Sequence, residues 1–142
     1  MKYVCNEATF DLPDDLVDRT VNMLMSHDGV SVSYVITRDQ LLEGERLEGF
    51  VSRQLKDLSR QVSKFKETSR SEVRLGVAER VALGLQIDAS FKQQGREIFQ
   101  RQAVVQLPGG SGGLIRTASA FRPFIDEEIA QWQKALASCT LL

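Results

Sequence analysis

The chain has 142 residues, of which 42% are hydrophobic and 26% are charged, the proportions of an ordinary globular protein. We expect one domain, residues 1–142, with a hydrophobic core large enough to be stable without disulfide bonds or a structural metal. A net charge of -1 argues against nucleic acid or an anionic membrane as a partner. No segment approaches the roughly 20 apolar residues of a membrane helix. The N-terminus lacks a secretory signal, so a cytoplasmic protein without membrane insertion is expected.

Short strands separated by turns open the chain, and they are predicted at residues 3–5, 9–12 and 20–25. Pro13 ends the second of these, because proline donates no ladder hydrogen bond. In the third, Val21 and Met23 fall on the same side. The sequence does not say which face of the sheet that side joins, so both residues are compatible with a core position or with a cleft.

A turn at 27–29 leads into a strand predicted at residues 30–37. Its even positions are apolar or aromatic, whereas its odd positions are Ser31, Ser33, Val35 and Thr37. This period of two is typical of half-buried antiparallel strands. The strand is therefore expected to carry one apolar side and one neutral side.

An amphipathic helix is predicted next, at residues 47–62, where apolar residues recur with a spacing of three or four. Gln54 lies within this apolar stripe rather than opposite to it. Further strands are predicted at residues 73–77, 81–91, 98–107 and 114–121, followed by a helix that begins near residues 125–128. The order favours an α+β fold with a curved antiparallel sheet. We expect both amphipathic helices on one face of the sheet and the other face open.

The neutral sides of the central strands are the main candidate for a functional surface. In the strand at 81–91 they hold Gln86, Asp88 and Ser90, and in the strand at 98–107 they hold Gln100 and Gln102. Arg101 interrupts the opposite, apolar side of the latter strand. Alternation alone leaves two interpretations open: an ordinary solvated sheet face, or a face that covers apolar atoms and offers hydrogen bonds.

Residues for catalysis are scarce. His27 is the sole histidine and lies in a predicted turn, which makes a nucleophile–histidine pair or a histidine metal site hard to assemble. Cys5 and Cys139 lie near opposite ends and are expected as buried thiols rather than as a redox or zinc motif. The glycine-rich stretch at 108–113 lacks the lysine and spacing of a phosphate-binding loop. We therefore expect a protein that is not an enzyme and uses neither metal nor cofactor.

A set of short segments, in this order, resembles the Eag-type adaptor chaperones of type VI secretion systems. The matching segments are Tyr3-Val4-Cys5-Asn6-Glu7, Asp11-Leu12-Pro13, Asp18-Arg19-Thr20-Val21-Asn22, Val35-Ile36-Thr37-Arg38-Asp39, Phe50-Val51-Ser52-Arg53-Gln54-Leu55, Gly95-Arg96-Glu97 and Arg101-Gln102, with Trp132 near the end. The resemblance runs over nearly the whole chain. It rests on the set, since no single segment is diagnostic.

The resemblance implies a cytoplasmic homodimer. Its partner would be the hydrophobic N-terminal region of a type VI secretion effector, often an Rhs protein with a PAAR domain. It would shield the effector's transmembrane helices until loading onto the VgrG spike. The family's apolar contacts map onto Val21, Met23 and Val35, and its hydrogen-bonding contacts map onto Ser33, Thr37, Gln54 and Gln102. Relatives often carry serine where this chain has Thr37. Arg38 and Asp39 are expected to be structural, as an ion pair or turn anchor.

Two other functions use the same predicted sheet face. One is a carrier for a small apolar ligand, which would require a closed apolar pocket. The other is a binding module for a folded protein partner. The absence of an evident histidine or cysteine centre argues against catalysis in either case.

Overall fold

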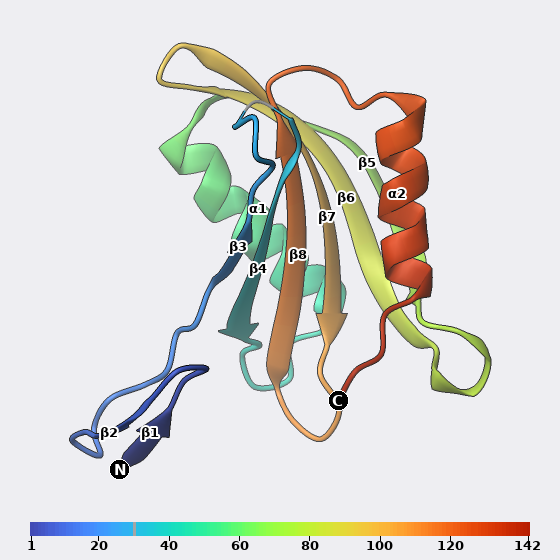
Figure 1. Ribbon diagram of the computed structural model, residues 1–142. Coiled ribbons are helices and arrows are strands. Elements are labelled where there is room, and N and C mark those ends of the chain that lie inside the picture. The colour runs from blue at the N-terminus through green and yellow to red at the C-terminus, as the bar shows by residue number, and fades with distance from the viewer. Residues whose placement is uncertain (30) are drawn as a thin grey trace.

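The described residues, 1–29 and 31–142 of a computed structural model, form an open antiparallel sheet flanked by two α-helices (Figure 1). The elements are β1 (Lys2–Val4), β2 (Thr9–Asp11), β3 (Asn22–Leu24), β4 (Ser33–Gln40), α1 (Leu47–Gln61), β5 (Ser63–Leu75), a 3-10 turn (Ala78–Arg80), β6 (Ala82–Gln93), β7 (Arg96–Gln106), β8 (Gly112–Ala120) and α2 (Asp126–Ala137). The predicted α+β class and curved open sheet are confirmed. Val30, the predicted first residue of the fourth strand, lies outside the described residues.

The main sheet has the strand order β3-β4-β8-β7-β6-β5, with every neighbouring pair antiparallel. Strands β5 to β8 form a meander, and β4 joins it by pairing with β8. The first two strands form a separate hairpin (Figure 1). The predicted strand at 20–25 is shorter than expected, because only residues 22–24 pair with β4.

The expectation that both helices cover one face is wrong, because α1 and α2 lie on opposite faces of the sheet (Figure 1). The reason lies in β7, where three consecutive residues, Ala103, Val104 and Val105, are buried. Successive side chains of a strand point to opposite faces. Val104 therefore packs under α1, whereas Ala103 and Val105 pack under α2.

The α1 side of the core is built around Phe50, which is 0% exposed. Phe50 packs with Val51, Leu55 and Ile115 over one end of the sheet. Gly113 permits this close approach, since a Cβ there would lie 3.3 Å from the Phe50 ring. On the other face, α2 contributes its own cluster, built from Trp132 and Leu136 against Val32, Leu75, Ala103, Val105, Ala118 and Ala120.

The polar side of β6 does not join the polar side of β7. The register pairs Ile87 with Gln102 and Asp88 with Arg101. Opposite residues of an antiparallel pair share a face, so Gln86, Asp88 and Ser90 lie on the α2 face. Arg101 there donates hydrogen bonds to Asp88 at 3.0 and 3.3 Å. The charge of Arg101, the residue that interrupts the apolar side of β7, is thus neutralised by Asp88 of β6.

Residues 73–75 of the strand predicted at 73–77 are the end of a much longer edge strand, β5, which follows α1, whereas residues 76 and 77 lie beyond that strand. Charged residues occupy much of its length, and its pairing with β6 is interrupted by two irregularities. Lys64, at the first of these, has a φ of 53°. Charges and bulges are devices that keep an edge strand from pairing with another chain. This edge is therefore well protected against further pairing.

Candidate functional site

The neutral sides of β4, β7 and β8 meet on the α1 face of the sheet. The registers place Met23, Val35, Thr117, Gln102 and Ile87 in one row across five strands. Ser33 lies opposite Ser119 in a parallel row. Helix α1 packs over β5, β6 and β7 on this face and contacts β4 at its C-terminal end through Gln54 and Arg53.

A groove of about 320 Å³ lies between α1 and these strands. Its lining is Val35, Thr37, Phe50, Val51, Gln54, Leu55, Leu58, Gln100, Gln102, Val104, Ile115, Thr117 and Ser119. It adjoins a second hollow of about 360 Å³, and the two share Gln100 and Ser119. None of the residues lining the first groove carries an ionisable side chain. The surface is therefore aliphatic and aromatic with interspersed hydroxyls and amides.

The structure brings most of the predicted site residues together. Val35, Thr37, Gln54 and Gln102 line the groove, and Ser33 lines the adjoining hollow. Met23 shares their face at the sheet edge and is 67% exposed. Val21, which is 51% exposed, precedes β3 and lines neither hollow. The predicted alternation of β4 and β7 therefore locates a real surface feature.

A chain of hydrogen bonds crosses the floor of the groove. The Gln102 amide donates to Gln100 at 3.3 Å, and the Gln100 amide donates to the Ser119 hydroxyl at 3.2 Å. Gln100, Thr117 and Ser119 were not among the predicted site residues. The signal was present, because Gln100 belongs to the predicted neutral side of its strand, and alternation within 112–120 assigns Thr117 and Ser119 to one side.

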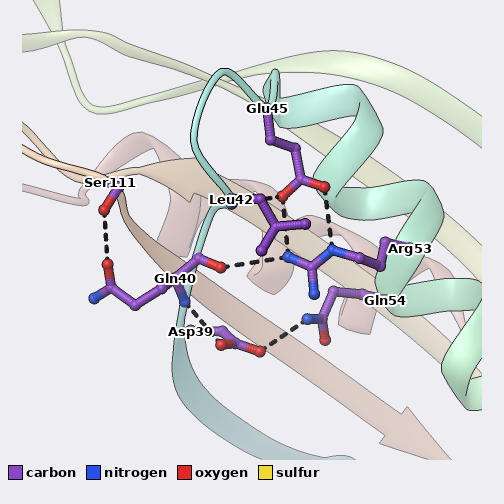
Figure 2. Close-up of polar contacts among 7 residues, drawn as sticks. All are labelled: Asp39, Gln40, Leu42, Glu45, Arg53, Gln54 and Ser111. Carbon is purple, nitrogen blue, oxygen red and sulfur yellow. Dashed lines mark hydrogen bonds and ion pairs between the residues drawn. The ribbon is translucent and has the colours of Figure 1, made fainter.

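Gln54 reaches from α1 toward the end of β4, where its side-chain nitrogen donates to Asp39 at 2.8 Å (Figure 2). The other carboxylate oxygen of Asp39 accepts the backbone N–H of Gln40 at 2.8 Å. Arg38 faces the opposite way and donates to the Asn22 side chain at 2.6 Å, which ties β3 to β4. Arg38 and Asp39 thus have structural partners, as expected, although they do not pair with each other.

A second contact fixes the start of α1. Arg53 donates to both carboxylate oxygens of Glu45, at 3.1 and 3.0 Å, and to the backbone carbonyl of Gln40 at 3.3 Å (Figure 2). The hydrogen bond from Arg53 lowers the pKa of Glu45 below its ordinary value. Gln40 in turn accepts the Ser111 hydroxyl at 2.8 Å. The helix, β4 and the glycine-rich loop are thereby joined beside the groove.

The arrangement suits binding. Within residues 1–29 and 31–142, no group of three histidine, cysteine or acidic side chains is placed to hold a metal ion. In the same part of the chain, neither α-helix is long and apolar enough to span a membrane. Cys5 and Cys139 are free thiols, half-buried rather than buried as expected.

The fold and the groove define an open α+β protein with an uncharged cradle on one face of its sheet. The chain belongs to the DcrB family, whose model matches residues 7–138. A curated protein of Pseudomonas aeruginosa strain PAO1 named Effector EagT6 is 26% identical to it over 107 residues, 73% of this chain and 72% of that protein. The expected resemblance to Eag-type proteins is thus confirmed.

The fold recurs in a crystal structure of PA94 from Pseudomonas aeruginosa, a protein of unknown function. The TM-score is 0.75, and the match covers 99% of this chain and 95% of that one at 21% identity. At this identity the likeness shows a shared fold. It adds no information about the partner.

Proposed function

We propose that this protein is a cytoplasmic chaperone associated with a type VI secretion effector, and that its groove holds apolar helices from the effector's N-terminal region. The similarity to Effector EagT6 supports the class of function. The observation that carries the binding mode is the lining of the groove, in which aliphatic side chains alternate with hydroxyls and amides and no charge is present.

This lining matches the needs of a membrane helix held in water. Such a helix exposes roughly 20 apolar residues, and each Å² left in water costs about 25 cal/mol. Within membranes, helices associate through close packing and through hydrogen bonds to serine, threonine, asparagine and glutamine. Val35 and Leu58, which are half-buried, can pack against an apolar helix, while Thr37 and Gln102 supply polar contacts of that kind.

The openness of the groove also favours a helix over a small molecule. The lining residues extend into a second hollow through Gln100 and Ser119, so the surface is a trough rather than a closed cavity. A carrier for a small apolar ligand would need its ligand enclosed on most sides. Met23, exposed at the open edge, adds an adaptable apolar contact for an irregular partner.

The same proposal includes a homodimer and delivery of the effector, of the PAAR or Rhs type, to the VgrG spike. The edge strand β3 supports a contact between subunits, because Met23 and Leu24 are more than half exposed there. In contrast to the charged edge at β5, the three residues of β3 carry no charged side chain. Val21 would act at this edge rather than in the groove.

Co-expression with the hydrophobic N-terminal region of an effector encoded nearby tests the proposal. The expected result is a co-purifying complex and a higher soluble level of the effector. The same effector without its hydrophobic region is the matched control and is expected not to bind. Failure of the full region to co-purify would refute the proposal, and a small molecule retained in native mass spectrometry would favour the ligand-carrier function instead.

A further inference from the structure

We propose that Asp39 sets the hydrogen-bonding polarity of the groove, by holding Gln54 so that its carbonyl oxygen faces the bound helix and selects a serine or threonine hydroxyl on that helix. This inference rests on the function proposed above and concerns the same groove. Asp39 acts as a positioning residue, since Gln54 lines the groove and Asp39 does not.

The polarity follows from the chemistry of the contact. An ionised carboxylate has acceptors only, whereas a glutamine side chain has a donating nitrogen and an accepting oxygen. The atom of Gln54 that lies 2.8 Å from Asp39 must therefore be the nitrogen. The carbonyl oxygen of Gln54 takes no part in this contact, and Figure 2 shows the nitrogen as the atom joined to Asp39. The charge of Asp39 makes the reversed amide unfavourable.

The other amides of the groove have no such constraint. Gln102 donates to Gln100, and Gln100 donates to the Ser119 hydroxyl. Every member of this chain both donates and accepts, so the whole chain can reverse its direction and keep both hydrogen bonds. Among the described residues that line the groove, Gln54 is the one bonded to a carboxylate.

The fixed acceptor restricts what the partner can present at this point. The backbone N–H groups of an apolar helix are satisfied within the helix itself. A donor for Gln54 must therefore come from a side chain, and a hydroxyl is the small donor that fits a tightly packed helix surface. An ether oxygen, which only accepts, would oppose the Gln54 carbonyl without a hydrogen bond.

The structure makes a sharper prediction for Asp39→Asn. The backbone N–H of Gln40 lies 2.8 Å from one carboxylate oxygen, so the new asparagine keeps its oxygen at that position. Its nitrogen then occupies the place of the second oxygen and faces Gln54. Gln54 must turn over to accept from this nitrogen, which presents its own NH2 group to the groove. The replacement inverts the polarity of Gln54 instead of merely deleting a contact.

Four synthetic helical peptides test the inversion. Each is an apolar leucine–alanine helix with lysines at both ends, and they differ at one central residue: serine, alanine, O-methylserine or norvaline. Serine and alanine compare a hydroxyl with no hydroxyl. O-methylserine and norvaline have similar shapes, and of these two only the ether accepts a hydrogen bond. Affinities are measured by fluorescence anisotropy with labelled peptides.

The wild-type protein is expected to bind the serine peptide about fivefold more tightly than the alanine peptide, the effect of one hydrogen bond. It should bind the O-methylserine peptide no more tightly than the norvaline peptide. With Asp39→Asn, the ether peptide should gain about fivefold over norvaline. Asp57→Asn, a matched replacement on the exposed side of α1, should behave as the wild type.

Measurements on the free protein separate this inference from the proposed function. Nuclear Overhauser contacts should link the Gln54 amide protons to the Asp39 side chain in the wild type, and the reversal of the amide in Asp39→Asn should weaken these contacts. If this reversal is absent, or if Asp39→Asn keeps the wild-type peptide preferences, the polarity inference is wrong. If no peptide binds the wild type, the proposed function and the hydroxyl preference both fail. Should Asp39→Asn not fold, Gln54→Met must lose the preference for serine over alanine.

Discussion

Replacing Val35 by aspartate places a carboxylate on the floor of the groove, in the row between Met23 and Thr117. Val35 is half-buried and does not belong to either core cluster. In the free protein the new carboxylate therefore stays hydrated, and we expect little loss of folding stability. When an apolar helix covers the groove, the same carboxylate loses its water and has no cation beside it.

The cost of binding then follows from the protonation of this carboxyl. The ordinary pKa of an aspartic acid, about 3.9, lies about three pH units below neutrality. Each of these units adds about 1.4 kcal/mol to the free energy of protonating the carboxyl. Binding with the carboxyl protonated at pH 7 costs about 4 kcal/mol, or about a thousandfold in Kd. At pH 5 the cost falls to about 1.5 kcal/mol, or about tenfold. Burial raises the pKa of the carboxyl in the complex, so affinity returns as the pH falls.

The assay is the anisotropy titration of the alanine peptide at pH 7 and pH 5, with circular dichroism to verify folding. Val35→Asp is expected to recover about a hundredfold in affinity between these pH values. Val35→Asn, of the same shape without the charge, should weaken binding at both pH values alike. A defect in Val35→Asp that is equal at pH 7 and pH 5 would refute the placement of Val35 beneath the bound helix.

Three further outcomes are expected. Gln102→Ala should weaken binding of the effector's hydrophobic N-terminal region about fivefold without lowering Tm, whereas Gln106→Ala, outside the groove, should leave the same binding unchanged. Phe50→Ala should lower the free energy of unfolding in urea by about 3–5 kcal/mol, because Phe50 is fully buried. Hydrogen bonding from Arg122 holds the pKa of Glu128 below its ordinary value of 4.5. The contact between Glu128 and Arg122 therefore stabilises the fold fully above pH 4.5, and this stabilisation is lost as the pH falls through the lowered pKa of Glu128. The Tm advantage over Glu128→Gln should shrink accordingly in acid.

Much of the groove could be predicted from alternation and helical spacing. The odd positions of β4 place Ser33, Val35 and Thr37 on one side, and the structure keeps them on one face. Gln54 stands in the apolar stripe of its helix, and it does point toward the sheet. A polar residue at an inward position of a helix is a signal that its surroundings are not simply core.

Alternation could not predict which side of one strand shares a face of the sheet with which side of the neighbouring strand. The turn between β6 and β7 has Gln94 and Gly95 both at positive φ, 51° and 78°, the backbone of a two-residue hairpin. It pairs Gln93 with Arg96, and this register brings Ile87 opposite Gln102. A turn one residue longer would reverse the faces of β6. The placement of α2 was missed for a related reason, since buried residues on both sides of β7 call for a covering layer on each face.

The pairing of β4 with β8 also determines when the groove comes into existence during synthesis. Ser33 and Thr37 leave the ribosome early, but their partners Ser119 and Ile115 are among the last strand residues to emerge. Until β8 has been synthesised, β4 lacks the strand that pairs with it along its whole length, and its polar side chains do not yet line a groove. A shortened chain that ends before Gly112 keeps α1 but lacks α2 and β8, the strand that pairs with both β4 and β7 in the middle of the trough. The proposed binding trough therefore requires the chain to be synthesised through β8.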